Sequence, residues 1–237
     1  MPHFLLEKSN YIFPHPYLAD KDGFLAMGGD LSPQRILSAY QAGIFPWYNE
    51  STPILWFSTH PRLIIYPDKL KISKSMKQLF RRKAFDVSID TEFSEVIEQC
   101  AKQSREGQDG TWITDDLKDA FVELHDMGYA HSVEVWDNGA LVGGLYGLSI
   151  GRVFFGESMF ALKSNASKYG FISLANLLRD KSFELIDCQQ DTPHLRSFGA
   201  ELISQGDFHN RLKRNTLEEG NQGKWTDWIS GQPIFQK

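Results

Sequence analysis

The pattern of hydrophobic and polar residues changes near residue 60, and the change divides the chain into two parts. Before it, aromatic and turn-forming residues dominate, and one short helix is expected to begin at Ser32-Pro33 and end at Gly43. Serine caps helices well, and proline suits the first helical position. A strand is expected over residues 54–57, and α/β alternation begins near residue 61. We therefore predict a small N-terminal domain over 1–60 and a larger domain over 61–237.

The larger part is predicted to build its own sheet. Two apolar stripes with helical spacing precede apolar strands at 131–136, 141–150 and 152–160. Asp137-Asn138-Gly139 is a strong hairpin signal between the first two strands, and Gly151 marks the next turn. A helix over 166–179 and a strand over 183–189 follow, and then helical turns flank a short strand near Leu202. The helical stripes comprise Phe93, Val96, Ile97, Cys100 and Ala101, and Leu117, Ala120, Phe121 and Leu124.

This order of elements resembles the N-acyltransferase fold of acetyl-coenzyme A enzymes. In that fold an antiparallel meander feeds a helix and then a strand parallel to the last meander strand. The resemblance implies an α+β protein. Its small N-terminal domain would lie beside a C-terminal N-acyltransferase-like (GNAT-like) mixed-sheet domain.

Two of the apolar strands carry polar side chains that need partners. Glu157 lies in the third strand of the meander, and Asp187 and Gln189 lie in the strand after the helix. Strand alternation predicts that Asp187 and Gln189 share one face while Cys188 takes the other, and that Glu157 shares a face with Phe155 and Met159. Burying such groups is costly without a partner. They are either satisfied core polar residues or a site that holds and orients an amine.

Charge is distributed unevenly along the chain. The 237 residues include 25 Lys and Arg against 30 Asp and Glu, which gives a net charge of −5. Between Lys69 and Lys83, however, there are seven basic residues and no acid. A helix beginning at Ser73 would expose several of these charges on one side, as phosphate contacts require. The alternative is a solvated face. The residues predicted to bind nucleic acid are Lys74, Lys77, Arg81 and Arg82.

Several classes of protein are disfavoured. Two cysteines, Cys100 and Cys188, provide neither a disulfide framework nor metal-ligand spacing. No apolar run reaches membrane-spanning length, and Met1-Pro2-His3-Phe4 lacks the features of a signal peptide. We expect a cytoplasmic monomer with no metal and no membrane contact.

Three motifs together resemble the leucyl/phenylalanyl-tRNA–protein transferases. They are Gly156-Glu157-Ser158-Met159-Phe160, Asn165-Ala166-Ser167-Lys168 and Leu185-Ile186-Asp187-Cys188-Gln189. The resemblance runs over nearly the whole chain, from Gly28 to Phe208. It implies transfer of Leu or Phe, and less readily Met, from leucyl-tRNA or phenylalanyl-tRNA to proteins with N-terminal Arg or Lys. Such proteins would be marked for N-end-rule degradation, and no cofactor would be needed.

The resemblance also implies a set of site residues. Asp187 and Gln189 would act at the reacting centre with Glu157, whose role toward donor or acceptor stays open. Trp47 and Trp112 would stack the terminal adenosine of the tRNA. The chain departs from the family pattern at Phe121 and Leu145, where tyrosine and methionine are usual. The residues expected to line the aminoacyl pocket are Leu145, Phe154, Met159, Phe171 and Ile186.

Two other functions remain open. A coenzyme A-dependent N-acetyltransferase would need a glycine-rich pyrophosphate loop between Phe160 and Ala166, and that segment has no glycine. The nearest similar motif, at 196–201, follows the wrong strand. An RNA-binding module without catalysis would explain the basic helix but not the polar residues in the apolar strands.

Overall fold

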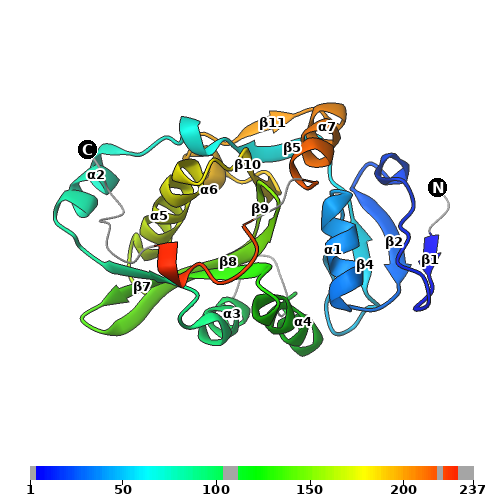
Figure 1. The fold of residues 1–237 in the computed structure, drawn as a ribbon, viewed down its shortest axis with the longest axis horizontal. Coiled ribbons are helices and arrows are strands. Elements are labelled where there is room, and N and C mark those ends of the chain that lie inside the picture. The colour runs from blue at the N-terminus through cyan, green and yellow to red at the C-terminus, as the bar shows by residue number, and fades with distance from the viewer. Residues whose placement is uncertain (1–3, 104–111, 218–220, 229–237) are drawn as a thin grey trace.

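The computed structural model describes residues 4–103, 112–217 and 221–228 and contains two mixed sheets. One sheet has four strands and lies at the N-terminal end of the molecule, and the other has seven (Figure 1). The protein is therefore a mixed α/β protein. Trp112 is described, but the two residues before it, Gly110 and Thr111, lie outside the described residues.

The N-terminal sheet has the order β1-β2-β4-β3. Its strands are β1 (Phe4–Leu6), β2 (Phe24–Gly28), β3 (Phe45–Pro46) and β4 (Leu55–Phe57), with a short 3-10 helix at Pro16–Leu18. The helix α1 (Pro33–Gln41) begins after Ser32 as expected. The predicted side-chain cap is wrong, because the Ser32 hydroxyl donates to Asp30 Oδ1 at 2.6 Å and makes no cap hydrogen bond. Gly43 follows the helix in the left-handed region, at φ 74°.

The seven-stranded sheet has the order β11-β5-β10-β9-β8-β7-β6. The predicted meander is confirmed, and its first turn has positive φ at Asn138 (51°) and Gly139 (80°), as a tight hairpin of this type requires. β10 pairs in parallel with β9, as predicted, while every other described pairing in this sheet is antiparallel. The strands are β5 (Arg62–Ile65), β6 (Asp86–Ile89), β7 (Ala130–Asp137), β8 (Ala140–Ile150), β9 (Val153–Ala161), β10 (Leu185–Gln189) and β11 (Glu201–Ile203).

Helices cover both faces of this sheet. α3 (Phe93–Ala101) and α4 (Asp115–Asp126) lie on one side, and α5 (Ala166–Asp180) lies on the other (Figure 1). The apolar stripes predicted for α3 and α4 are buried, apart from the partly buried Ala101, and most of the apolar side chains of α5 are buried as well. The remaining elements are a 3-10 turn at Pro67–Lys69, α2 (Lys74–Arg81), α6 (Pro193–Arg196), α7 (Gln205–Asn215) and a last 3-10 turn at Thr226–Trp228.

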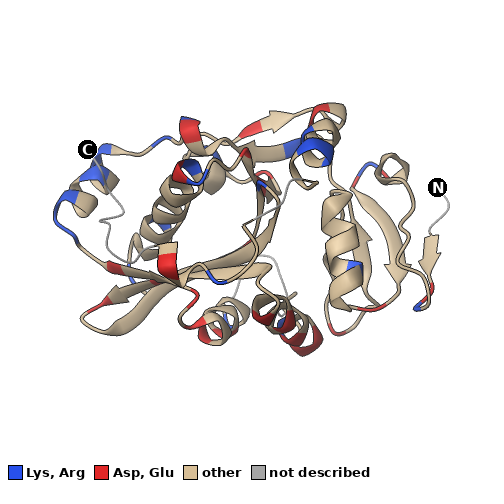
Figure 2. Ribbon diagram, in the orientation of Figure 1, with Lys and Arg blue, Asp and Glu red and all other residues tan. Residues whose placement is uncertain are grey.

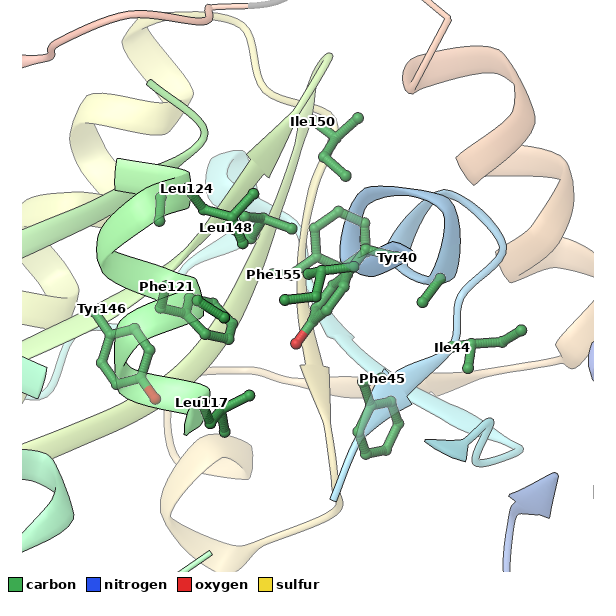
Figure 3. Close-up of a cluster of buried hydrophobic side chains, with 14 of the residues drawn as sticks. Tyr40, Ile44, Phe45, Leu117, Phe121, Leu124, Tyr146, Leu148, Ile150 and Phe155 are labelled. Carbon is green, nitrogen blue, oxygen red and sulfur yellow. The ribbon is translucent and has the colours of Figure 1, made fainter. Parts of the chain in front are cut away.

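The core on the α3/α4 side continues into the N-terminal part of the chain. Tyr40 of α1 and Phe155 of β9 belong to the same buried cluster, and their rings meet edge to face with centroids 5.2 Å apart (Figure 3). Trp56 of β4 belongs to it as well and is fully buried. The two sheets are thus joined by one continuous apolar cluster.

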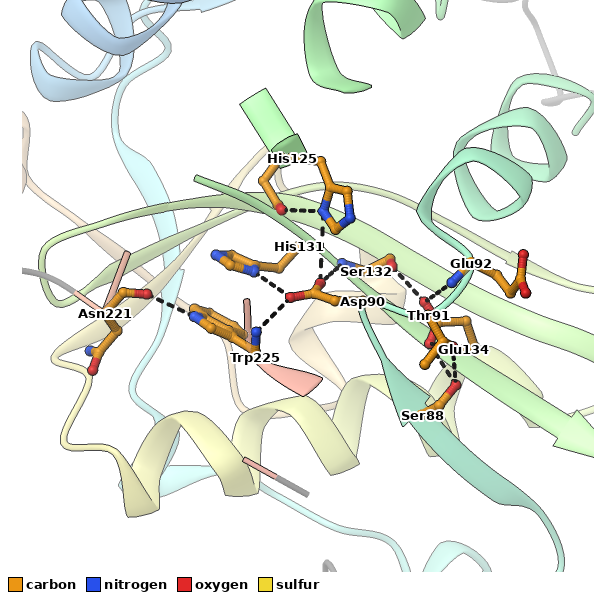
Figure 4. Close-up of polar contacts among 11 residues, drawn as sticks. Ser88, Asp90, Thr91, Glu92, His125, His131, Ser132, Glu134, Asn221 and Trp225 are labelled. Carbon is orange, nitrogen blue, oxygen red and sulfur yellow. Dashed lines mark hydrogen bonds and ion pairs between the residues drawn. The ribbon is translucent and has the colours of Figure 1, made fainter. Parts of the chain in front are cut away.

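A buried polar network fixes the segment near the C-terminus to the larger sheet (Figure 4). Asp90 accepts hydrogen bonds from the backbone N–H groups of Ser132 (3.0 Å) and Trp225 (2.9 Å), and the ring of His131 lies 2.9 Å from its second oxygen. The indole ring of Trp225 stacks on His131 with centroids 3.6 Å apart. These hydrogen bonds and the ring stacking hold residues 221–228 against β7, although Nε2 of His131 is buried without a hydrogen-bond partner among the described residues.

Candidate active site

An irregularity in β9 determines the direction of the Glu157 side chain. Gly156 pairs with Gly147 and Ser158 pairs with Tyr146, so Glu157 is an extra residue in the strand. Such a bulge reverses the alternation of side chains beyond it. The prediction that Phe155, Glu157 and Met159 all share one face is therefore wrong, although Glu157 and Met159 line the same cavity. Phe155 packs on the α3/α4 side, whereas Met159 packs on the α5 side.

Glu157 and Gln189 are directly hydrogen-bonded. The Gln189 amide nitrogen Nε2 donates to Glu157 Oε1 at 2.8 Å. The same oxygen accepts a second hydrogen bond, from the hydroxyl of Tyr40 at 2.8 Å. Burial raises the pKa of Glu157 to about 7, although the hydrogen bonds from Tyr40 and Gln189 act in the opposite direction. The carboxyl group can therefore change its charge near neutral pH.

Asp187 is held by an arginine that the sequence analysis did not single out. Arg62 Nε and one terminal nitrogen each lie 2.8 Å from a different oxygen of Asp187, and both side chains are almost completely buried. The guanidinium carbon lies 4.9 Å from the ring centre of Phe45 and 4.7 Å from that of Phe208. The sequence signal for this ion pair was the position of Arg62 at the start of the apolar strand Leu63-Ile64-Ile65, because a buried cation needs a partner of opposite charge.

The end of β10 is also irregular, and this places Gln189. The pairing with β5 shifts between Asp187 and Gln189, and Gln189 has φ 58°. Its backbone N–H donates to Asp187 Oδ1 at 2.9 Å, and its carbonyl accepts from the Thr59 hydroxyl at 3.0 Å. Arg62 donates to that same hydroxyl at 3.2 Å. Asp187 and Arg62 thus stabilise the left-handed backbone that directs the Gln189 side chain toward Glu157.

One cavity of about 280 Å³ opens beside Glu157 on the α5 side. It lies between β8, β9, α5 and β10, and α6 contributes His194 and Leu195 to its wall. Most of the wall is apolar, which suits a hydrophobic side chain. The lining includes all five residues predicted for the aminoacyl pocket, namely Leu145, Phe154, Met159, Phe171 and Ile186. Phe121 is not in this lining and instead packs edge to face on Tyr146.

A second cavity, of about 140 Å³, lies next to the first. Trp47 and Trp112 both line it, together with Gln189. The two tryptophans come from loops more than sixty residues apart in the sequence, and each is only partly buried. The cavities share several lining residues, so Glu157 borders both spaces at their junction. The shared residues are Gly156, Glu157, Cys188, Thr192 and Leu195.

The described residues do not favour a reactive cysteine, a metal centre or a membrane-spanning helix. Cys188 is buried beside Ile186 in the α5-side core, and burial raises the pKa of its thiol well above the usual value. In residues 4–103, 112–217 and 221–228, no group of three or more His, Cys, Asp or Glu side chains could hold a metal ion. No helix in this described part is long and apolar enough to cross a membrane.

The basic segment forms the predicted helix. α2 is capped by Ser73, whose hydroxyl accepts from the Met76 N–H at 3.3 Å, and its apolar side packs on α5 through stacking of Phe80 on Tyr169. Lys and Arg positions gather on α2 and the segments next to it at this end of the molecule (Figure 2). Just before α2, the Lys71 N–H donates to the Phe198 carbonyl at 2.8 Å. The basic segment therefore adjoins the turn that follows α6, and α6 lines both cavities. The exposed basic residues include Lys74, Lys77, Arg81 and Arg82.

Two adjoining cavities meet at the partly buried pair of Glu157 and Gln189, and this arrangement suits a transferase that binds two substrates. Comparison with known proteins identifies its family. Residues 64–213 match the family model described as leucyl/phenylalanyl-tRNA protein transferase, and residues 29–60 match the model of its N-terminal domain. The chain belongs to the leucyl/phenylalanyl-tRNA protein transferase family.

Relatives with this family name are similar over almost the whole chain. The leucyl/phenylalanyl-tRNA–protein transferase of Myxococcus xanthus is 48% identical over 98% of this chain and 100% of its own length. That of Pseudomonas fluorescens is 50% identical over 93% of this chain and 97% of its own length. A solved structure of L-PGS from Bacillus licheniformis covers 79% of this chain, and this chain covers 63% of that one. Its TM-score of 0.41 and 12% identity support no conclusion about function.

Proposed function

We propose that this protein transfers leucine or phenylalanine, and less readily methionine, from aminoacyl-tRNA to the N-terminal Arg or Lys of acceptor proteins. The product would be a protein marked for N-end-rule degradation. The observation that carries the proposal is the junction of the two cavities at Glu157 and Gln189. One cavity is apolar and fits the donor side chain, and the other holds the tryptophans that suit the terminal adenosine. Because one chain lines both cavities, we propose that it acts as a monomer.

The reaction needs positioning more than strong acid or base. The donor is an ester between the amino acid and the 3′ end of the tRNA, and the acceptor is an α-amino group with an ordinary pKa of about 7.7–8. The neutral amine attacks the ester carbonyl, a C–N bond forms, and the bond to the tRNA oxygen breaks. The proton lost by the amine goes to the departing tRNA hydroxyl. Holding both substrates at one junction supplies the alignment that this reaction lacks in water.

Gln189 is suited to receive the attacking amine. Its Nε2 donates to Glu157, so its amide oxygen is left as the acceptor group. An amide oxygen can accept a hydrogen bond from the amine and so orient the nitrogen lone pair toward the ester carbon. We propose that Asp187, with both oxygens engaged by Arg62 and the Gln189 N–H, acts by positioning Gln189 and not by touching the amine.

Glu157 is suited to bind a cationic group of a substrate. Its Oε1 accepts from Tyr40 and Gln189, whereas no group in the described part of the chain donates to Oε2. The ionised carboxylate can therefore bind an ammonium or guanidinium group at the junction. The donor's own amino group and the acceptor's basic side chain both have this chemistry.

The proposed tRNA contact extends from the tryptophan-lined cavity to α2. We propose that Lys74, Lys77, Arg81 and Arg82 bind the phosphates of the tRNA, since all four are exposed and carry the same charge. The link between this helix and the cavities is α6, which lines both of them.

We assign the larger sheet to the N-acyltransferase-like (GNAT-like) class, on the basis of the meander β7-β8-β9, the helix α5 and the parallel strand β10. An acetyl-coenzyme A enzyme of this class would cradle pyrophosphate between β9 and α5. The residues there, 161–165, contain no glycine. Calorimetric titration with acetyl-coenzyme A should show no binding. Saturable binding in the micromolar range would support the acetyltransferase alternative.

The decisive experiment is incubation of the protein with leucyl-tRNA and a peptide that begins with Arg, followed by mass measurement. The peptide should gain the mass of one leucine residue, without any added cofactor. The same peptide with an acetylated N-terminus is the matched control and should stay unchanged. An unmodified free peptide, with intact leucyl-tRNA at the end of the incubation, would contradict the proposal.

A further inference from the structure

Tyr40 connects the N-terminal part of the chain to the candidate active site. It lies in the last turn of α1 and is 1% exposed. Figure 3 shows its side chain extending from α1 into the apolar cluster beside Phe155. From there its hydroxyl donates to Glu157 Oε1 at 2.8 Å, across 117 residues of sequence. The contact is therefore a tertiary one between α1 and the bulge of β9.

The end of α1 is fixed by α7. Nε2 of His209 lies 3.2 Å from the carbonyl oxygen of Ala42, the residue after the helix. The next residue, Gly43, lies so close to Phe208 that a Cβ atom would come within 2.8 Å of the Phe208 ring. Phe208 also packs over Arg62. One helix thus supports both Tyr40 and the arginine that holds Asp187.

Two donors share one oxygen of Glu157. Tyr40 approaches Oε1 from α1, and Gln189 Nε2 approaches it from β10, each at 2.8 Å. The charged groups near Glu157 are the carboxylate of Asp187 on β10 and the guanidinium of Arg62 on β5. Arg62 and Asp187 are paired with each other, and Asp187 also holds the backbone of Gln189. Tyr40 is therefore the donor that stabilises the Glu157 carboxylate independently of the Arg62–Asp187 pair.

We propose that Tyr40 is a positioning residue for aminoacyl transfer, and that its hydroxyl favours the ionised form of Glu157 and fixes the oxygen to which the Gln189 amide is hydrogen-bonded. In this way α1 sets the orientation of the amide at the reacting centre. The inference rests on the proposed function, since it assigns Tyr40 a task in that reaction. It involves no new covalent step.

The test is the variant Tyr40→Phe, which keeps the ring and its packing on Phe155. Labelling glutamate with ¹³C at the carboxyl carbon allows Glu157 to be titrated by NMR, and its signal is identified by its loss in Glu157→Gln. A hydrogen bond to a charged group corresponds to roughly one to two pH units. The pKa of Glu157 should therefore rise by about one unit or more in Tyr40→Phe. The acid limb of the pH–rate profile for transfer should shift by the same amount. Both proteins are assayed with the same acceptor peptide, so that the titration of its α-amino group affects both profiles equally.

The matched control is Tyr48→Phe, which removes a hydroxyl bonded to Thr114 at 2.9 Å and leaves the contacts of Glu157 unchanged. It should alter neither the NMR titration of Glu157 nor the pH–rate profile for transfer. In a Glu157→Gln background, Tyr40→Phe should cause no further change in the shape of the pH–rate profile. An unshifted Glu157 titration in folded Tyr40→Phe would overturn the inference while leaving the transferase activity of the unaltered protein intact. If the unaltered protein has no transferase activity, the proposed function fails, but the NMR titration still tests the contact.

Discussion

Arg62 and Asp187 are 125 residues apart in the sequence and form a buried bidentate ion pair with two contacts of 2.8 Å. The pair lies at the start of β5 and near the end of β10, neighbouring strands of the large sheet. Through the Gln189 N–H it stabilises the irregular backbone at the candidate active site. Stability and catalysis are therefore expected to depend on the same residues here.

Asp187→Asn should lower both the free energy of unfolding and the transfer rate. The substitution leaves the Arg62 guanidinium buried without a counter-charge, and breaking a buried pair in this way costs about 3–5 kcal/mol. Urea unfolding and transfer kinetics on the same preparation measure the two effects. Asp191→Asn is the control, because the ion pair of Asp191 with Arg196 is exposed and should contribute little to either quantity. Normal stability of Asp187→Asn would show that Arg62 is solvated.

The free energy of unfolding should decrease as the pH rises, because of Glu157. Burial raises its pKa from 4.5 to about 7, so the folded state binds the proton more tightly than the unfolded state. The stability contribution of the protonated group is complete below pH 4.5 and is lost as the pH rises toward about 7. Between pH 5.5 and 8 the wild type should lose about 2 kcal/mol relative to Glu157→Gln. Urea unfolding of both proteins at the two pH values measures this, and parallel pH dependences would mean that Glu157 titrates normally.

Replacing Lys74, Lys77 and Arg81 together by Ala should weaken tRNA binding, with little dependence on the tRNA sequence. The slope of log affinity against log salt concentration should become smaller in magnitude by up to about 3. Each phosphate contact that is lost reduces the number of counterions released when the tRNA binds. Filter binding over a range of salt concentrations measures it. Lys8, Lys21 and Lys102 are three exposed lysines elsewhere on the chain, and their triple Ala variant is the control. Equal salt slopes for the two triple variants would identify α2 as an ordinary solvated face.

Leu145→Phe should change donor selectivity. Leu145 lines the cavity of about 280 Å³, and a larger side chain there leaves less room for phenylalanine than for leucine. The ratio of kcat/KM for phenylalanyl-tRNA to that for leucyl-tRNA should fall about tenfold, the usual scale of steric discrimination in an apolar pocket. Leu141→Phe on the same strand, outside the cavity lining, is the control. An unchanged ratio in Leu145→Phe would place the donor side chain elsewhere.

The sequence by itself determined the order of the elements from α3 to β10 and several of the chemical groups of the site, but it did not predict the strands β1, β2, β5 and β6. The turn at Asn138-Gly139, the amphipathic helix after Ser73 and the meander all follow from local rules of period and turn geometry, and each is present in the structure. The run of basic residues was visible because charge needs no fold to be counted. The five pocket residues were proposed from the family resemblance, and the structure brings them to one cavity.

Only the tertiary structure decided how these groups meet. The bulges in β9 and β10 change which face a side chain takes, and alternation along a strand contains no information about an inserted residue. Met159 therefore lies on the opposite face of the sheet from Phe155, although alternation predicts that the two share one face. The partners of Glu157 and Asp187, Tyr40 and Arg62, lie 117 and 125 residues away in the sequence. Such contacts depend on how α1, β5 and α7 pack together, and no local pattern specifies that packing.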